Sequence, residues 1–183
     1  MLPKIIQQYL KLFPEEQSRL QLLQDQIKNG EELNNRRNFN GHITGSGLVL
    51  SPDRTKLLLI NHKVLGLWLQ PGGHWEPSEA NPRLAAIRET QEETSIQIAE
   101  SIPVLPDQIL VPLDIDTHHI PANNAKKELE HWHHDFRYVF IAKDMTFTHQ
   151  AAEVSSAKWF DLHDPLLAFI QRSINKMKTL KII

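Results

Sequence analysis

The sequence predicts an α+β fold, an α/β/α sandwich built on a mixed β-sheet. Strand-like apolar segments recur between residues 42 and 162, while helical patterns lie at both ends of the chain and once in its middle. No segment of the sequence is repeated. Strands mixed with a few helices, without a repeating unit, are typical of one sheet that is covered by helices.

Length and composition indicate one domain of ordinary globular type. The chain has 183 residues, of which 40% are hydrophobic and 23% are charged, so it can form a substantial core. The net charge of −2 gives no electrostatic reason for a nucleic acid or an anionic membrane as partner. We therefore expect neither of these partners.

The chain contains no cysteine, which excludes disulfides, thiolate metal sites and a cysteine nucleophile. The first residues form an amphipathic pattern, not a basic head followed by an apolar block, so they do not resemble a signal peptide. No apolar run approaches membrane-spanning length. The expected location is the cytoplasm.

Two helices are expected within residues 3–29. Apolar stripes occur on both sides of Pro14, which suits a helix start, and Gly30 suits a helix end. The polar residues that follow predict a connector. We therefore divide the chain into an N-terminal helical extension, residues 1–40, and a main domain, residues 41–183, which includes a C-terminal helix.

Strands are expected throughout the main domain. The patterns predict a hairpin-like pair, a short extended piece broken by two glycines, and four further strands. These segments are residues 42–51, 56–63, 66–76, 95–105, 108–116, 131–143 and 157–162. Residues 116–130 predict a long polar loop. Asp164 before Pro165 predicts the start of the last helix.

An acidic segment, residues 73–96, is the most informative part of the sequence and is called the acidic motif below. Its second half predicts a helix over residues 82–94. On that helix Glu89, Glu92 and Glu93 fall within an arc of about 100°. Because like charges this close destabilise an isolated helix, the acidic face is either well solvated or holds a cation.

The order of residues in the acidic motif resembles that of the Nudix hydrolases. Their motif is Gly, five residues, Glu, seven residues, Arg-Glu, an aliphatic residue, any residue, Glu-Glu, any residue, Gly and an aliphatic residue. The corresponding residues here are Gly73, Glu79, Arg88, Glu89, Glu92 and Glu93. The resemblance implies a Nudix-type α/β/α sandwich with a mixed sheet, to which the N-terminal helical extension is added.

The motif departs from the family pattern at three places. Eight residues separate Glu79 from Arg88, so the loop before the helix holds one extra residue. Ser95 replaces the closing glycine and must adopt a backbone that glycine prefers. Thr90 replaces an aliphatic residue. None of these changes removes a carboxylate, so we expect the chemistry to be retained.

The resemblance implies a Mg²⁺ site, with Mn²⁺ as a possible substitute. Carboxylate oxygens grouped on one helix suit such hard cations. By the resemblance, Glu89 and Glu93 are the leading ligands and Glu92 is a secondary ligand. The backbone carbonyl of Gly73 completes the ligand set.

The resemblance also implies a catalytic set that extends beyond the metal ligands. Arg88 is expected to orient Glu79 through an ion pair and not to touch the substrate. Many relatives place a further glutamate before a late strand, as a metal ligand or general base, and Glu153 occupies a comparable place; an ordinary exposed carboxylate is the other interpretation. The catalytic candidates are Glu79, Arg88, Glu92, Glu93 and Glu153.

A histidine-rich segment lies around the start of the strand expected at residues 131–143. Four residues share one face of that strand: His131, His133, Asp135 and Arg137. His133, Asp135 and Arg137 could line a substrate groove, with Arg137 binding a phosphate or carboxylate. His131 and His133 could instead bind a second metal together with a histidine of the preceding loop. In a third interpretation, this face is a polar network that holds the loop.

The predicted function is that of a Mg²⁺-dependent pyrophosphohydrolase, which cleaves the diphosphate linkage of a nucleoside diphosphate joined to another moiety. The alternative is a non-catalytic Nudix-like domain with a nucleotide-binding or regulatory role. Such domains typically lose carboxylates of the motif, and those carboxylates are present here. Isopentenyl diphosphate isomerase shares the fold but uses a cysteine, which this chain lacks. The expected partner is a small nucleotide or diphosphate, and the N-terminal helices and sheet edges could support a homodimer.

Overall fold

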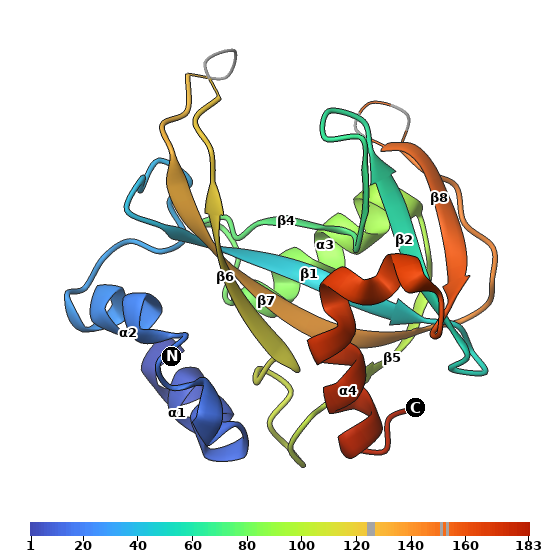
Figure 1. Ribbon diagram of the computed structural model, residues 1–183, viewed down its shortest axis with the longest axis horizontal. Coiled ribbons are helices and arrows are strands. Elements are labelled where there is room, and N and C mark those ends of the chain that lie inside the picture. Colours follow the sequence, from blue (N-terminus) through green and yellow to red (C-terminus); the bar gives the residue numbers. More distant parts are fainter. Residues whose placement is uncertain (124–126, 151, 153) are drawn as a thin grey trace.

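A computed structural model, which describes residues 1–123, 127–150, 152 and 154–183, shows within those residues one mixed eight-stranded sheet flanked by helices (Figure 1). The helical elements are α1 (Leu2–Leu12), η1 (Pro14–Glu16, 3-10), α2 (Gln21–Lys28), α3 (Pro82–Thr94), η2 (Pro165–Ile170, 3-10) and α4 (Gln171–Thr179). The strands are β1 (His42–Leu50), β2 (Lys56–His62), β3 (Leu67–Leu69), β4 (Gly72–His74), β5 (Ile98–Ile102), β6 (Asp114–Ile120), β7 (His131–Ala142) and β8 (Val154–Asp161). The predicted α+β class is confirmed. Every helix in the described part of the chain is too short or too polar to cross a membrane.

The central strand of the sheet is β1. It runs parallel to β7 along its whole length. On its other side, within the described residues, β1 pairs with β4 at Thr44, Gly45 and Ser46, and with β2 at Leu50 alone. The hairpin-like pair expected from the sequence is thus antiparallel, but β2 soon leaves β1 and pairs with β8 and β3. The separation allows β4, with its glycines, to lie beside β1.

Alternate residues of β1 face two different cores. Val49 belongs to the cluster that contains Ala86 of α3, whereas Leu48 belongs to the cluster that contains Ile174 of α4. The alternation follows from the period of two along a strand. Helix α3 therefore covers one face of the sheet and α4 the other, as Figure 1 shows, and the predicted α/β/α layering is present.

Helix α3 lies very close to β1 because two glycines of the strand face it. A Cβ atom on Gly45 would lie 2.4 Å from the carbonyl oxygen of Pro82, and one on Gly47 would lie 2.3 Å from Oγ1 of Thr90. The buried residues of α3 are Pro82, Ala85, Ala86, Thr90, Glu93 and Thr94. Most of them are small, so the acidic helix can approach the sheet closely and bring Glu93 into its interior.

Both ends of α3 are defined by local interactions. Oδ1 of Asn81 accepts a hydrogen bond from the N–H of Leu84 at 3.2 Å, and Pro82 occupies the first turn. At the other end Ser95 adopts a left-handed backbone with φ of 53°, and its N–H donates to the carbonyl of Gln91 at 2.8 Å. The serine therefore takes the conformation that glycine usually provides at this position.

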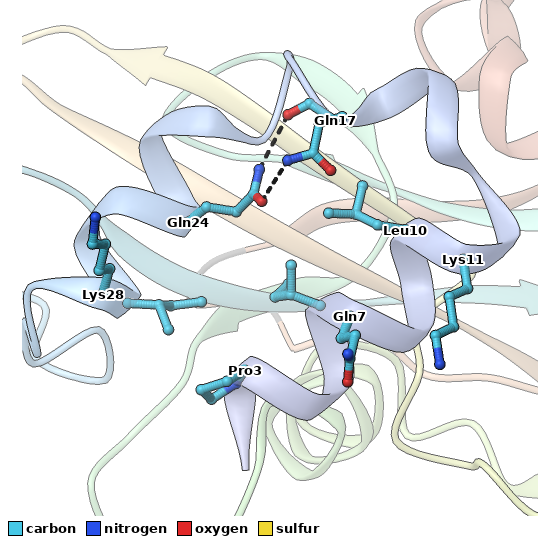
Figure 2. Close-up of a pocket in the computed structure, with 9 residues that line it drawn as sticks. Pro3, Gln7, Leu10, Lys11, Gln17, Gln24 and Lys28 are labelled. Atoms are coloured by element: carbon cyan, nitrogen blue, oxygen red, sulfur yellow. Dashed lines mark hydrogen bonds between the residues drawn. The ribbon is translucent and has the colours of Figure 1, made fainter.

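The N-terminal helices expected from the sequence are present and pack against the sheet. Tyr9 of α1 and Leu23 of α2 are fully buried in the same cluster as Phe136 of β7. A groove of about 540 Å³ lies between α1 and α2, where Nε2 of Gln17 donates to Oε1 of Gln24 at 2.8 Å (Figure 2). Among the described residues that line this groove, none belongs to the acidic motif.

A buried ionic network joins the N-terminal helices, the sheet and α4. Asp114 of β6 is fully buried and accepts hydrogen bonds from Arg172 at 3.0 Å and from Lys176 at 2.8 Å. Nη1 of Arg137 lies 3.4 Å from Asp114, and Lys176 also donates to the hydroxyl of Tyr9 at 2.7 Å. The members of this ionic network are Tyr9, Glu16, Arg19, Asp114, Asp116, Asp135, Arg137, Arg172 and Lys176.

Three expectations about the region before β7 had the wrong bounds. The strand expected at residues 108–116 begins only at Asp114, because Pro112 has no N–H for a strand ladder. The loop expected at residues 116–130 begins only at residue 121, because the polar residues up to Ile120 continue β6 and pair with β7. The strand expected at residues 95–105 is also shorter, since β5 covers only its middle.

Candidate active site

Arg88 of α3 is the centre of the acidic motif. Its Nε donates to Glu79 at 2.9 Å, its Nη1 donates to Glu89 at 2.8 Å and to Glu92 at 3.1 Å, and its Nη2 donates to the carbonyl of His74 at 3.0 Å. Burial would lower the pKa of Arg88, but the hydrogen bonds and charges of Glu79 and Glu89 outweigh burial and raise that pKa. The expected ion pair between Arg88 and Glu79 is therefore present, and it connects the loop, the helix and β4.

The two glycines of β4 lie directly against the carboxylates of α3. A Cβ atom on Gly73 would lie 2.2 Å from Oε1 of Glu89, so a side chain there would displace this carboxylate. The N–H of Gly72 donates to Oε2 of Glu93 at 2.9 Å. The strand thus approaches both glutamates through its bare backbone, which places the backbone of Gly73 beside the carboxylate of Glu89.

The glutamates of the motif differ strongly in exposure. Glu93 is only 4% exposed, whereas the side chain of Glu92 is 54% exposed. The side chain of Glu89 is intermediate, with 15% exposed. A carboxylate that is partly withdrawn from water interacts more strongly with a cation. Glu93 and Glu89 are therefore better shielded from water than Glu92.

The loop that carries Glu79 closes on itself. One carboxylate oxygen of Glu79 accepts the N–H of Glu76 at 2.9 Å, and its other oxygen accepts Nε of Arg88. The carbonyl of Glu79 accepts the indole N–H of Trp75 at 3.0 Å. The extra residue in this loop is therefore accommodated without loss of the contact between Glu79 and Arg88.

The oxygen donors at the contact between α3 and β4 fit a hard divalent cation. The candidates are the carboxylates of Glu89 and Glu93 and the carbonyl of Gly73, all of them oxygen ligands of the kind that Mg²⁺ prefers. Arg88 lies at the edge of this set and holds one oxygen of Glu89. Glu89 and Glu93 both meet β4, so the contact brings oxygen ligands of the right chemical type to one short strand.

Glu153, the candidate general base, lies outside the described residues. The chain shortly before it, however, contacts the C-terminal end of α3. The N–H of Thr148 donates to the carbonyl of Thr94 at 3.1 Å, and the N–H of Gln150 donates to the carbonyl of Glu93 at 3.0 Å. The segment that leads to Glu153 therefore passes the end of the acidic helix.

Asp135 of β7 is held by hydrogen bonds from three elements. It accepts the hydroxyl of Ser46 at 2.6 Å, the hydroxyl of Thr44 at 3.2 Å, the amide of Gln70 at 3.0 Å and Nε of Arg137 at 2.9 Å. It is 3% exposed. The polar face predicted for β7 thus continues onto β1, and Asp135 fixes the two strands to each other.

Arg137 is engaged inside the protein. Its guanidinium pairs with Asp135 at 2.9 Å, with Asp116 at 3.1 Å and with Asp114 at 3.4 Å, and its side chain is 6% exposed. Burial would lower the pKa of Arg137, but the three carboxylates outweigh burial and raise it. These contacts match the interpretation of this face as a polar network.

The structure brings the strand histidines together with two histidines that the sequence did not indicate. His131 and His133 of β7 lie beside His42 of β1, and His74 of β4 borders them, with its ring centroid 5.1 Å from that of His42. His42 and His74 were missed because only strand pairing places them here. The loop histidine His118 is instead in β6, 3.3 Å from Asp116.

Comparison with known proteins shows the family of this chain. The family model of the NUDIX domain matches residues 41–179. A curated protein from Lactococcus lactis subsp. cremoris (strain MG1363), named "Probable DHNTP pyrophosphohydrolase", is 34% identical over 129 residues, which cover 70% of this chain and 68% of that protein. The chain therefore belongs to the Nudix family. It is a Nudix hydrolase of the pyrophosphohydrolase type.

Solved structures with low sequence identity share the fold. A NUDIX-family hydrolase from Clostridium perfringens has a TM-score of 0.56 and 20% identity, over 77% of this chain and 97% of that chain. An Ap4A hydrolase from C. elegans, solved as a binary complex, has a TM-score of 0.54 and 20% identity, over 76% of this chain and 97% of that chain. The Nudix fold predicted from the acidic motif is thus confirmed.

Proposed function

We propose that this protein is a Mg²⁺-dependent pyrophosphohydrolase that cleaves the diphosphate linkage of a nucleoside diphosphate joined to another moiety. Membership of the Nudix family supports the type of reaction. The complete set of acidic-motif carboxylates supports catalysis over a non-catalytic binding domain. The absence of cysteine argues against an isomerase that needs a thiol.

The contact between β4 and the acidic face of α3 is the observation that carries this proposal. The backbone of Gly73 lies so close to Glu89 that a Cβ atom there would approach the carboxylate to 2.2 Å. The neighbouring Gly72 donates its N–H to Glu93 at 2.9 Å. Because β4 presents no side chain here, the carboxylates of Glu89 and Glu93 can serve as the oxygen ligands that a hard cation prefers.

Each residue of the motif receives a role in this proposal. Glu89 and Glu93 hold the cation, and the exposed Glu92 assists them. Bound Mg²⁺, with Mn²⁺ as a substitute, would neutralise charge on the diphosphate oxygens and make a water more acidic. Arg88 acts as a positioning residue, since its guanidinium holds Glu79 and Glu89 at hydrogen-bond distance.

Residues outside the motif complete the proposal. Glu153 is assigned the role of general base from its place in the sequence before β8. His133 is assigned to the wall that faces the substrate, and the buried Asp135 is assigned to holding that wall in place. The internal ion pairs of Arg137 support a positioning role, in which it holds Asp135 and does not bind phosphate itself.

A panel of diphosphate compounds tests the proposed reaction. We expect metal-dependent release of a nucleoside monophosphate or of pyrophosphate from at least one compound, with Mg²⁺ or Mn²⁺. The panel should contain DHNTP and Ap4A, after the names of the relatives, together with nucleotide sugars. Tight binding of one compound without cleavage of any would favour the binding-domain alternative. Light scattering of the same sample tests for the homodimer that the N-terminal helices and sheet edges could support.

The change Glu93→Gln tests the metal site itself. The glutamine keeps the size of the side chain but removes the charge, so we expect kcat to fall by roughly 100-fold or more, since a catalytic cation contributes several kcal/mol. The control is Glu100→Gln on β5, outside the motif, where the side chain is 57% exposed and lies 3.9 Å from Arg54. Metal-dependent turnover at the wild-type rate in Glu93→Gln would contradict the assignment.

A further inference from the structure

We propose that His42, His131 and His133 form a second metal site, separate from the acidic motif, which binds a borderline divalent transition ion such as Zn²⁺. These three residues are called the histidine cluster below. Their side chains come from β1 and β7, which run parallel and are neighbours in the centre of the sheet. Within the described residues they each offer a ring nitrogen, and these three atoms all lie within 4.8 Å of one another.

The distances in the histidine cluster suit a small ion with nitrogen ligands. Nε2 of His131 and Nε2 of His133 are 3.1 Å apart. Two ligands at about 2.0–2.1 Å from a tetrahedral ion are separated by roughly 3.3–3.4 Å. The ring centroid of His42 lies 4.9 Å from that of His131 and 4.7 Å from that of His133. Small side-chain rotations are therefore enough to bring the three nitrogens to one ion.

Hydrogen bonds on the far sides of two rings fix the form of imidazole that a metal requires. Nδ1 of His42 lies 3.1 Å from the carbonyl of Asn38, and Nδ1 of His131 lies 2.7 Å from the carbonyl of Leu129. A carbonyl can only accept, so each Nδ1 carries the proton and each Nε2 keeps its lone pair. Metal-binding histidines generally have such a second partner.

The buried Nε2 of His42 gives independent support for a ligand at this place. His42 is 1% exposed, and within the described part of the chain its Nε2 atom has no hydrogen-bond partner. A buried polar atom without a partner is costly, and a metal ion would satisfy it.

Three imidazoles without a carboxylate select the class of ion. Nitrogen ligands suit Zn²⁺ and its transition-metal neighbours, whereas Mg²⁺ prefers oxygen. With three protein ligands, a fourth position stays open for water or a ligand. His74 of β4 borders this position, with its ring centroid 5.3 Å from that of His133. Because His74 directly follows Gly73, the histidine cluster lies next to the acidic motif and yet uses different side chains.

The test is zinc binding by the untagged full-length protein after treatment with EDTA. We expect the protein to bind one equivalent of Zn²⁺ in competition with a chromophoric chelator. When Co²⁺ replaces Zn²⁺, we expect the visible absorption of a tetrahedral complex. The affinity should fall by roughly 100-fold or more in His131→Gln and His133→Gln, because each change removes a direct ligand and even the loss of an outer-shell partner costs up to about 100-fold. Zn²⁺ at 100 times its Kd should raise Tm by about 5–10 °C.

Two matched variants separate this site from its surroundings. His119→Gln changes an exposed histidine of β6, the strand that pairs with β7 on its other side, and Glu93→Gln changes the acidic motif; both should keep the zinc affinity of the wild type. Absence of zinc binding by the wild type would overturn the proposal, as would a loss of zinc in Glu93→Gln with retention in His133→Gln. If the histidine variants fail to fold, the proton NMR spectrum of the Co²⁺-loaded wild type provides the test. We expect three shifted imidazole N–H signals in this spectrum. Absence of such signals would overturn the proposed site.

Discussion

Ser95 shows how a single residue adapts to the end of the acidic helix. Its φ of 53° lies in the left-handed region, which costs a residue with a side chain about 1–2 kcal/mol. The side chain is exposed, so packing does not compensate for this strain. The N–H of Ser95 still closes the helix on Gln91 at 2.8 Å. The strain energy at this position therefore arises in the backbone of Ser95 and is not offset by packing of its side chain.

Replacement of this residue should reveal the strain directly. We expect Ser95→Gly to raise the free energy of unfolding by about 0.5–1 kcal/mol, because the relief of strain exceeds the entropy that glycine loses on folding. Ser95→Val should lower it, since a β-branched side chain tolerates a positive φ poorly. Urea unfolding measures both changes. A glycine variant less stable than the wild type would show that Ser95 is not strained.

Separation along the chain decided which site residues could be predicted. The contact between Glu79 and Arg88 was predicted because both belong to one continuous motif. His42 was not predicted, because it reaches His133 only through the parallel pairing of β1 and β7. The register of these two strands depends on contacts between distant segments, and it cannot be read from the local pattern of a single sequence. The two strand histidines, two residues apart, were the only local signal of the histidine cluster.

At the scale of elements, the distance between α3 and β1 sets the geometry of the acidic motif. Gly47 allows this distance, since a Cβ atom there would lie 2.3 Å from Oγ1 of Thr90 and 3.1 Å from the ring of Phe140. We expect Gly47→Ala to lower the free energy of unfolding by about 1–3 kcal/mol, because the helix must move away. Urea unfolding provides the measurement, and a lower kcat should accompany it.

A second change on the helix tests this explanation. Thr90→Ala removes Oγ1, which is buried and has no hydrogen-bond partner among the described residues. In the Gly47→Ala background it should restore part of the stability, with a coupling of roughly 0.5–3 kcal/mol between the two sites. Simple addition of the two single effects would mean that the clash is relieved elsewhere.

The bounds of α3 and of β6 were predicted with different accuracy, and the difference has a physical reason. The limits of α3 were predicted well because its cap, its first-turn proline and its left-handed exit are all local. The strand β6 was misjudged because its residues are polar and resemble a loop. It is extended only because β7 supplies its hydrogen bonds, from Asp114 beside Arg137 to Ile120 beside His131. Strand identity of this kind depends on a partner more than on propensity.

At the scale of the whole molecule, the ionic network connects the two ends of the chain. Lys176 of α4 donates to Tyr9 of α1 at 2.7 Å and pairs with Glu16 at 2.6 Å. The family model begins at residue 41, so these contacts join the helices before the matched region to a helix inside it. We propose that residues 1–40 are an extension that is packed onto the Nudix domain, residues 41–183, and stabilised through this network.

Asp114 is the carboxylate on which this network converges. It is fully buried, and burial alone would raise its pKa. The hydrogen bonds of Arg172 and the charges of Lys176 and Arg137 outweigh burial and hold the pKa of Asp114 below its ordinary value. The unfolded chain therefore takes up a proton at a pH where the folded protein does not. The stabilisation is complete above about pH 4 and is lost as the pH falls below that value.

The change Asp114→Asn tests this role across pH. At pH 7 we expect it to lower the free energy of unfolding by about 3–5 kcal/mol, because Arg137, Arg172 and Lys176 lose their shared buried counter-charge. Below pH 4 the wild type loses the same contribution, so the difference between the two proteins should shrink, and the acid limb of the variant should be flatter. Urea unfolding at several pH values measures this, with the exposed Asp25→Asn as control. A difference that stays constant between pH 7 and pH 3 would mean that Asp114 acts through packing and not through its charge.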